Sequence, residues 1–367
     1  MYALLNATIY CWNQTISDKA LIIDNEIIVS IADPEDIPAE AEILDYTGLM
    51  IVPGLIDLQI AGAGGYLFSE NPMAEALNKI ADSIIKTGTT GFLIAVPTNS
   101  FSAYSEMFRI IRDNPHPAVL GLHLEGPYIN KSKGGAHNTE YIKLPDIDEL
   151  RELLDMAGDA IKMMTIAPEL CDREFINVLT EKGITVAAGH SNASFVEAME
   201  GFNNGVQTTT HLFNAMSAFH HRDPGLPGAT FVSENACASI IADGIHVSYN
   251  TLSIAKMIMK ERLYLVSDAV EENKTGAYRH QRRKDRFTLP NGTLSGSNLS
   301  MLDAVRNCVR NAGIPLEEAL RMASTYPARL IKSSNYGIIA PGSPANLIVL
   351  TKNLDLKHVI IGGDKYF

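Results

Sequence analysis

GITVAAGHSNASFVEAMEGFNNGVQTTTHLFN, residues 183–214, carries the clearest indication of the fold of this chain. It begins with a short β-rich run, TVAA at residues 185–188, and continues with a helical pattern from about residue 193 to residue 204. A second β-rich run, QTTT, occupies residues 207–210. Short strands that are joined by a helix run parallel to each other, and in such α/β folds functional sites lie at the carboxyl ends of the strands. The stretch therefore predicts a strand–helix–strand unit of an α/β protein.

A histidine stands at the carboxyl end of each of these two strands, His190 after the first and His211 after the second. Two imidazoles in matching positions can share one metal ion. The alternative is that each histidine caps its strand and hydrogen-bonds a neighbouring carbonyl, which is the better interpretation of a lone histidine. The pair in matching positions favours the metal site.

The size, charge and cysteine content of the chain limit its function classes. Its 367 residues, 46% of them hydrophobic, can form one large domain plus a smaller one. The net charge of −12 argues against nucleic acid and anionic membranes as partners. The four cysteines lack CxxC spacing, which favours reduced thiols. The N-terminal sequence lacks a signal-peptide pattern, and no apolar run approaches the ~20 residues of a membrane span, so we expect a cytoplasmic protein.

Both ends of the chain carry short β-rich runs that are separated by turn residues. Residues 1 to about 50 alternate apolar and polar positions between breaks at Asn, Asp and Pro, a pattern of hairpin strands. Residues 337–367 have the same character. Neither end can bury much surface alone, so we expect residues 1–52 and 335–367 to combine into one small discontinuous β-domain.

Eight β-rich runs that alternate with helical patterns fill the middle of the chain, residues 53–334. Apolar residues recur at helical spacing between most of the runs, for example over residues 73–86, 146–156, 173–181 and 252–260. Eight β/α units over roughly 280 residues match a (β/α)8 TIM barrel, which we therefore predict. The predicted strands are Leu55–Ile60, Phe92–Val96, Val119–Leu124, Lys162–Ala167, Thr185–Ala188, Thr208–His211, Ser239–Ala242 and Leu263–Ser267.

Polar residues of metal-binding or acid–base type follow six of the predicted strands. One such residue alone would be explained as a polar cap, but six together are hard to explain by packing. Glu125, His190 and His211 offer one carboxylate oxygen and two imidazole nitrogens, a three-ligand set that leaves an open position on a catalytic zinc ion. A zinc-bound water has a pKa of about 7, and Asp268 is placed to take its proton and deliver it to a leaving group. The six residues are Gln59, Glu125, His190, His211, His246 and Asp268.

Nine short motifs occur in order along the chain, namely PGLIDLQIAGAGG (53–65), LGLHLEGPYIN (120–130), KGGAHN (133–138), AAGHSNA (187–193), THLFNAM (210–216), IADGIHV (241–247), LVSDA (265–269), TLSGSNLSM (293–301) and PGSPANLIVL (341–350). Together they resemble the amidohydrolase superfamily and, more narrowly, the N-acetylglucosamine-6-phosphate deacetylases. The resemblance implies a (β/α)8 barrel with a small β-domain from both chain ends, and a homodimer. It also implies a hydrolase of amino-sugar metabolism that converts N-acetylglucosamine 6-phosphate to glucosamine 6-phosphate and acetate.

The resemblance further implies which residues form the site. Glu125, His190 and His211 would hold one divalent metal ion per subunit. Zinc is the first expectation, and Fe²⁺, Co²⁺ and Mn²⁺ are alternatives because a Glu-His-His site accepts each of them. Asp268 is the implied catalytic residue. The implied substrate contacts are Ala136, His137, Asn214, Ala215, Arg222, Asp243, His246, Leu294, Ser295 and Gly296.

The residues themselves support these contacts unequally. His137 lies in a Gly-rich loop that could close over the site and polarise the acetyl carbonyl, although a loop histidine is also often only solvated. Arg222 suits a phosphate because its planar guanidinium gives bidentate hydrogen bonds, although it could also be a surface arginine. The resemblance implies that Arg222 is donated to the partner's active site. The sequence of residues 294–296, taken alone, indicates no more than a turn.

The chain departs from many amidohydrolases at the positions that would hold a second metal. His-x-His after the first strand is replaced by Gln59 and Ala61, and a lysine after the fourth strand by Ala167-Pro-Glu169. Deacetylases with one metal often have Gln-x-Asn, so Ala61 is unusual even among them. We therefore expect one metal ion per subunit.

A second departure is the charged segment of residues 270–289, which follows the catalytic strand. A solvated hairpin is the simpler interpretation of this segment. The alternative is that its cations bias the preference for a sugar or a phosphate.

Two further functions compete with the deacetylation of N-acetylglucosamine 6-phosphate. One is the same reaction on N-acetylgalactosamine 6-phosphate, because few contacts read the sugar's 4-hydroxyl. The other is a non-catalytic sugar-phosphate binding protein, which the intact set of Glu125, His190, His211 and Asp268 disfavours. A dihydroorotase is disfavoured by the missing His-x-His and lysine.

Overall fold

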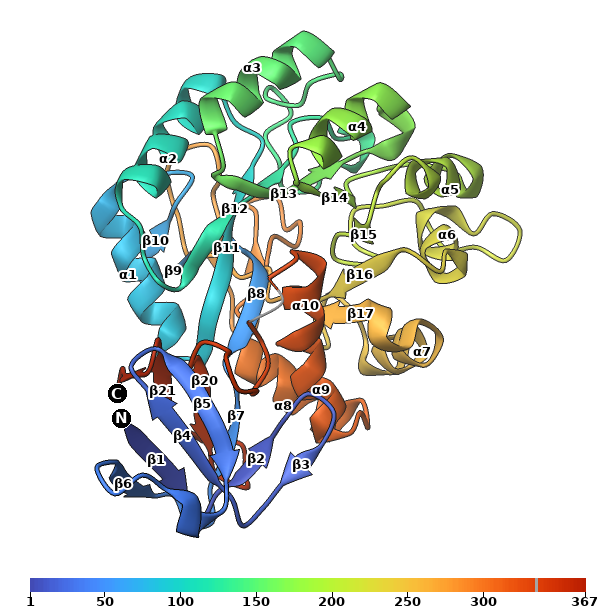
Figure 1. Ribbon diagram of the computed structural model, residues 1–367. Helices are drawn as coiled ribbons and strands as arrows, with labels where there is room; N and C mark the ends of the chain where they lie inside the picture. The colour runs from blue at the N-terminus through green and yellow to red at the C-terminus, as the bar shows by residue number, and fades with distance from the viewer. Residues whose placement is uncertain (334–335) are drawn as a thin grey trace.

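The computed structural model describes residues 1–333 and 336–367 of the chain. Eight parallel strands form a central barrel (Figure 1). The first and last strands close it, because Ile60 forms a parallel bridge with Ala269 and the Asp268 N–H donates to the Gln59 carbonyl at 2.9 Å. The predicted (β/α)8 barrel is therefore confirmed. Its strands, in sheet order, are β8 (Leu55–Ile60), β11 (Thr89–Pro97), β12 (Val119–Glu125), β13 (Ile161–Ile166), β14 (Thr185–Ala188), β15 (Thr208–Thr209), β16 (Cys237–Ile240) and β17 (Leu263–Leu265).

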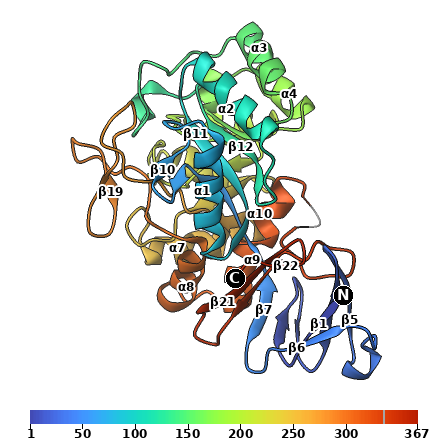
Figure 2. The ribbon, with the colours of Figure 1, turned by 90° about the vertical axis from the view of Figure 1, so that its left-hand side faces the viewer.

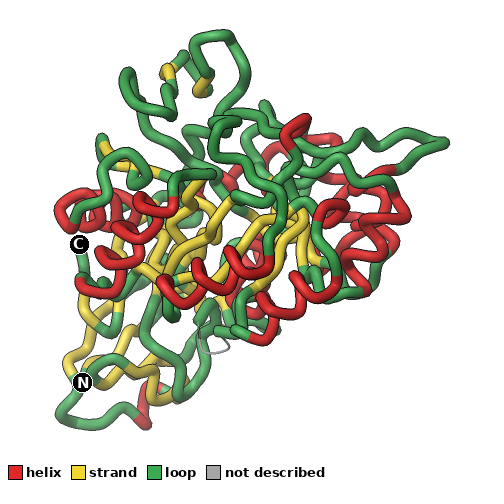
Figure 3. The backbone as a smooth tube through the Cα atoms, turned by 90° about the horizontal axis from the view of Figure 1, so that it is seen from above, coloured by secondary structure: helices red, strands yellow, loops and turns green. Residues whose placement is uncertain are grey.

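Helices cover the outside of the barrel, as the view from above shows (Figure 3). Polar side chains cap the N-termini of several of these helices. At α5, for example, Ser194 and Glu197 form a capping box. The helix predicted at residues 252–260 begins earlier, at Tyr249, because Ser248 caps it. In the described part of the chain, no helix has the length and hydropathy to cross a membrane. The helices are α1 (Ala74–Ile85), α2 (Phe101–Asp113), α3 (Ile147–Ala157), α4 (Arg173–Glu181), α5 (Phe195–Asn203), α6 (Gly225–Val232), α7 (Tyr249–Met259), α8 (Met301–Asn311), α9 (Leu316–Met322) and α10 (Thr325–Leu330).

Four barrel strands end earlier than the sequence predicts, β13 by one residue and β15, β16 and β17 by two, and β15 and β17 are the two that lead to His211 and Asp268. β15 contains only Thr208 and Thr209, and β17 ends at Leu265 rather than at residue 267. The chain leaves the extended conformation soon after each strand, since φ is 33° at His211 and 51° at Asp268. A left-handed residue cannot continue a β-ladder, so the strands stop short of the polar residues that follow them.

Both ends of the chain meet in one mixed sheet beside the barrel (Figure 2). In this six-stranded sheet, β20 from the C-terminal end pairs antiparallel with β7 from the N-terminal end, with Ile348 opposite Val52. One face packs on the barrel through Val52 and Ile348, and the other shares a core with the four-stranded sheet β5-β4-β1-β6. The strands of the two sheets are β1 (Tyr2–Leu5), β2 (Thr8–Tyr10), β3 (Thr15–Ile16), β4 (Ala20–Asp24), β5 (Ile27–Ala32), β6 (Glu42–Asp45), β7 (Met50–Pro53), β20 (Leu347–Leu350), β21 (Leu356–Ile361) and β22 (Asp364–Lys365).

Mixed sheets from both chain ends were expected, and they are present. The division into residues 1–52 with 335–367 and residues 53–334 stays a prediction, because one sheet packs on the barrel core. Its boundary at 334 and 335 lies outside the described residues.

The charged segment of residues 270–289, called the hairpin segment below, contains two short antiparallel strands, β18 (Gln281–Arg282) and β19 (Phe287–Thr288). It is a hairpin, but it is not simply solvated, because Tyr278, His280 and Phe287 are buried. The segment covers one side of the barrel mouth, where β9 (Gly62–Ala63) and β10 (Tyr66–Leu67) form another small hairpin. The solvated interpretation is therefore wrong for its inner side.

Candidate active site

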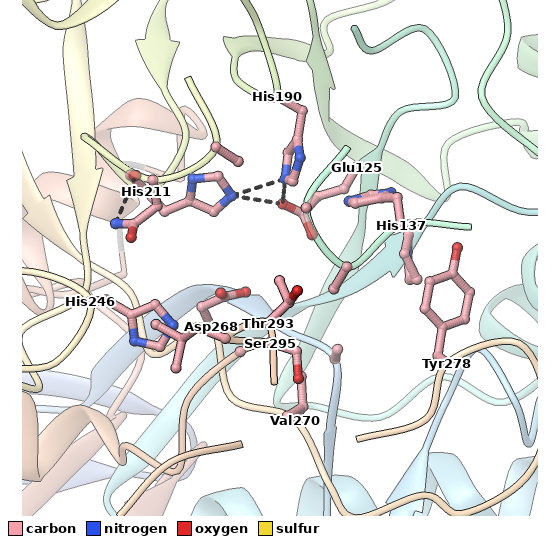
Figure 4. Close-up of a pocket in the computed structure, with 18 of the residues that line it drawn as sticks. Glu125, His137, His190, His211, His246, Asp268, Val270, Tyr278, Thr293 and Ser295 are labelled. Carbon is pink, nitrogen blue, oxygen red and sulfur yellow. Dashed lines mark hydrogen bonds and ion pairs between the residues drawn. The ribbon is translucent and has the colours of Figure 1, made fainter. Parts of the chain in front are cut away.

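A pocket of about 410 Å³ opens at the carboxyl ends of the barrel strands (Figure 4). It gathers residues from loops that lie far apart in the sequence. Two of the predicted substrate contacts, Arg222 and Asp243, do not line it. The predicted residues that do line it are Glu125, Ala136, His137, His190, His211, Asn214, Ala215, His246, Asp268, Leu294, Ser295 and Gly296.

Three buried ligand atoms meet at one point of this pocket. Glu125 Oε1 lies 3.5 Å from His190 Nε2 and 3.4 Å from His211 Nε2, and the two nitrogens are 3.1 Å apart. Metal–ligand bonds of about 2.0–2.2 Å place two ligand atoms of a tetrahedral site roughly 3.3–3.6 Å apart. The donor set and its spacing therefore fit one divalent metal ion, which Glu125, His190 and His211 would hold.

His137 forms an overlapping cluster, since one of its ring nitrogens lies within 4.8 Å of ligand atoms of Glu125 and His190. The hydrogen bonds of the rings decide between His137 and His211 as the third ligand. The backbone N–H of Thr98 donates to His137 Nδ1 at 3.2 Å, so the proton of a neutral His137 ring sits on Nε2. A nitrogen that carries a proton cannot bind a metal. His137 thus faces the pocket as an N–H donor, and His211 is the better third ligand.

His190 shows the opposite arrangement. Its Nδ1 lies 2.9 Å from the Lys133 carbonyl, which can only accept, so Nδ1 carries the proton and Nε2 presents its lone pair to the cluster. The two neighbouring histidines therefore differ in tautomer, and the difference comes from one backbone group beside each ring. Burial, assisted by the nearby His190, lowers the pKa of His137 to about 3, which keeps its ring neutral.

Gln59 joins the two carboxylates of the site. Its amide nitrogen donates to Glu125 Oε1 at 2.8 Å and to Asp268 Oδ1 at 3.0 Å. Burial and the charge of Glu125 raise the pKa of Asp268 to about 7. Burial also opposes ionisation of Glu125, but the two histidines beside it outweigh burial and hold the pKa of Glu125 well below its ordinary value. One carboxylate is thus a fixed anion and the other can exchange a proton near neutrality.

The backbone is left-handed at three of these residues, with φ of 47° at His190, 33° at His211 and 51° at Asp268. Such conformations cost non-glycine residues on the order of 1–2 kcal/mol and collect at functional sites. Behind Asp268, the buried Asp57 carboxylate accepts two hydrogen bonds from Ser267. One comes from the Ser267 hydroxyl, and the other comes from the Ser267 N–H at 3.2 Å. These contacts hold the strained turn so that Asp268 faces the histidines.

Two of the predicted substrate contacts, His246 and Asp243, form a hydrogen-bonded pair. His246 Nδ1 lies 2.6 Å from Asp243 Oδ2, and only His246 reaches the pocket. Hydrogen bonds from His246 and from two backbone N–H groups outweigh burial and lower the pKa of Asp243. Asp243 is therefore placed to orient His246.

The other predicted contacts lie in loops. Gly296 has φ of 64°, and a Cβ there would lie 2.4 Å from Val270, so this turn requires glycine. Arg222 is exposed on the loop between β15 and α6, outside the pocket of its own chain. Sequence reasoning missed Lys133, Tyr278, His280 and Thr293 as lining residues. The feature of the sequence that could have pointed to them was a tyrosine inside a highly charged segment.

We expect one tightly bound metal ion per chain. Ala61 offers no ligand, and Gln59 turns its donor nitrogen to both carboxylates. The Glu169 carboxylate, which follows the fourth barrel strand, accepts hydrogen bonds from the Ser191 hydroxyl at 2.6 Å and from the Asn192 N–H at 2.7 Å, so it is committed elsewhere. Elemental analysis of metal-replete protein tests this, and two tightly held ions per chain would contradict it.

Comparison with known proteins identifies the family of the chain. The amidohydrolase family profile matches residues 50–365, and the NagA composite domain matches residues 1–51. The chain is 33% identical to the N-acetylglucosamine-6-phosphate deacetylase of Haemophilus influenzae, over 99% of this chain and 98% of that protein. It is 32% identical to the N-acetylgalactosamine-6-phosphate deacetylase of a Shewanella species, over 86% and 82% of the two chains.

Among solved structures, the N-acetylglucosamine-6-phosphate deacetylase of Pasteurella multocida superposes with a TM-score of 0.95 at 33% identity, over 99% of both chains. The chain therefore belongs to the amidohydrolase family and, within it, to the family of the N-acetylglucosamine-6-phosphate deacetylases.

Proposed function

We propose that the protein hydrolyses the acetamide of N-acetylglucosamine 6-phosphate to give glucosamine 6-phosphate and acetate. The observation that carries this proposal is the meeting, in one buried pocket, of the Glu125–His190–His211 cluster with the proton-exchanging Asp268. A divalent metal ion held by the cluster, zinc in our expectation, would act as a Lewis acid and supply an activated water near neutral pH.

Asp268 acts as the general base and then as the general acid. Gln59 binds its Oδ1, which leaves Oδ2 for a proton. The carboxylate takes a proton from the attacking water and passes it to the amine as the C–N bond breaks. A pKa raised toward neutrality by burial suits a group that must both accept and release a proton.

His137 stabilises the charge that develops on the acetyl oxygen. Its Nε2–H faces the pocket because the Thr98 N–H occupies Nδ1. A neutral N–H donor that is fixed before the reaction stabilises the transition state without reorganisation. His137 therefore serves as an oxyanion donor rather than as a ligand.

The substrate's sugar and phosphate occupy the wider part of the pocket. Its volume of about 410 Å³ is in the range of small-molecule sites. His246, Asn214 and the backbone of Ala136 and Ala215 line it and offer polar contacts to the sugar. The dianionic phosphate needs cations in an acidic protein, and we assign this role to Arg222 of a partner subunit in a homodimer, since Arg222 lies outside its own pocket.

Arg222→Ala is expected to raise KM for the phosphorylated substrate and to change kcat less, because a phosphate contact is shared by the ground and transition states. Loss of a charged bidentate contact costs on the order of 1.5–3 kcal/mol, roughly a 10- to 100-fold loss in kcat/KM. The unphosphorylated sugar is the matched control and should hardly respond. An unchanged KM would remove Arg222 from the phosphate site.

Mixed dimers test the donation of Arg222 across the interface. When Arg222→Ala and Asp268→Asn subunits combine, donation in trans leaves one site intact and places both lesions in the other. Activity at low substrate concentration should then recover on mixing. No recovery in proven heterodimers would place Arg222 in its own subunit's site.

The galacto epimer is the second candidate substrate, because a relative at 32% identity is an N-acetylgalactosamine-6-phosphate deacetylase. Acetate release should be measured on both epimeric 6-phosphates under identical conditions. We expect the higher kcat/KM for the gluco epimer. A higher value for the galacto epimer would reverse the substrate assignment and leave the reaction unchanged.

A further inference from the structure

Tyr278, in the hairpin segment, reaches the active-site pocket from outside the barrel. Its side chain is buried and lines the pocket beside His137 (Figure 4). The Tyr278 hydroxyl donates to the carbonyl of Thr98 and also lies 3.1 Å from the Thr98 hydroxyl. Thr98 directly follows β11, so the tyrosine joins the hairpin segment to the end of a barrel strand.

Thr98 in turn holds His137 through two atoms. Its backbone N–H donates to His137 Nδ1 at 3.2 Å, and its hydroxyl oxygen lies 3.2 Å from the same nitrogen. Both the tautomer and the orientation of the imidazole therefore depend on where Thr98 is held. Because Tyr278 contacts the same residue on its carbonyl and hydroxyl, a change at Tyr278 is transmitted to the ring.

Tyr278 itself is fixed by a carboxylate from another loop. Glu70 Oε1 accepts the N–H of Tyr278 at 2.9 Å and that of Ala277 at 3.0 Å. Gly276 has φ of 76°, and a Cβ there would lie 1.9 Å from Glu70 Oε2, so the close approach requires glycine. A second tether joins the Gly65 N–H to Glu271 at 2.9 Å. The start of the hairpin segment is thus anchored, and Tyr278 enters the pocket in one position.

We propose that Tyr278 is a positioning residue, which holds His137 through Thr98 so that the imidazole N–H points at the acetyl oxygen of the substrate. The inference rests on the proposed deacetylation. It gives the hairpin segment a role in the rate of the reaction, through one buried hydroxyl rather than through its cations.

The central test is Tyr278→Phe, which removes only the hydroxyl. We expect kcat to fall about 10-fold with KM within about twofold, because a donor that has shifted slightly loses transition-state stabilisation but little ground-state binding. Tyr264→Phe is the matched control, since it removes another buried hydroxyl, 3.2 Å from that of Thr208, outside the pocket lining. The control should keep the wild-type kcat.

A double-mutant cycle separates positioning from general destabilisation. In a His137→Ala background, Tyr278→Phe should lower kcat by less than about twofold, since the ring it positions is gone. Glu70→Ala provides a second route, because it releases the anchor at a half-buried site, and its effect on kcat should also vanish without His137. An unchanged kcat in Tyr278→Phe would overturn the proposal, as would an equal loss with and without His137.

The ring-nitrogen NMR shifts of His137 give a readout that does not depend on turnover. In metal-loaded wild-type protein they should report a proton on Nε2, and in Tyr278→Phe a mixture of tautomers. Identical shifts in both proteins would contradict the hold of Tyr278 on His137. Inactive wild-type protein would contradict the proposed function alone, because the shifts still test the contact.

Discussion

Asp268→Asn is expected to lower kcat by about 10²–10⁴-fold while the metal content stays unchanged. Asparagine conserves the shape of the side chain and can still accept from Gln59, so the pocket should keep its structure. It cannot take a proton from water or return one to the departing amine. Glu125, His190 and His211 are untouched, so metal binding should persist.

Parallel measurement of kcat and bound metal tests this prediction. Asp148→Asn, which neutralises an exposed carboxylate on α3, is a suitable control and should keep the wild-type rate. Near-normal turnover in Asp268→Asn would move the base elsewhere in the pocket, with His246 or His137 as the next candidates. Loss of metal together with rate would instead mean that Asp268 is a ligand.

His137→Ala is expected to lower kcat by about 10²–10³-fold, the cost of removing one oxyanion donor, with a smaller change in KM. Metal binding should be retained, because the proton on Nε2 excludes the ring from the ligand set. His137→Gln should recover part of the rate, since its amide can still donate. His358→Ala, on the distant β21, controls for the loss of an imidazole.

Metal content distinguishes the two overlapping clusters that contain Glu125 and His190. If His137 were the third ligand, His137→Ala would lose the metal and His211→Ala would keep it. We expect the reverse pair of results.

The sequence patterns predicted the barrel well because its strands are short apolar runs that are buried on both faces, whereas its helices bury one apolar face. The conformation of the residues just after the strands was predicted less well. His211 was predicted as the last residue of a strand and Asp268 as the residue directly after one, yet both adopt left-handed conformations that tertiary contacts hold, such as those of Asp57 with Ser267. Local sequence patterns carry no signal for such turns, because the stabilising partner lies about 200 residues away along the chain.

The site residues that were predicted at strand ends come together at the pocket, whereas the sequence of the loops gave little information about the roles of their residues. Nothing in the sequence around His137 tells a ligand from a donor, since the difference depends on the Thr98 N–H. Gln59 was expected as one of the polar strand-end residues and as a poor ligand for a second metal, and the structure shows it bridging Glu125 and Asp268. The hairpin segment was interpreted by its charge, but buried residues of it, among them Tyr278 and His280, line the pocket.

The most direct test of the whole account is the amount of acetate and free amine that the metal-replete wild-type protein releases from N-acetylglucosamine 6-phosphate. We expect equal amounts of acetate and glucosamine 6-phosphate, formed over many turnovers and absent with Asp268→Asn at the same protein concentration. Binding of the sugar phosphate without any acetate release by fully metal-loaded wild-type protein would contradict it.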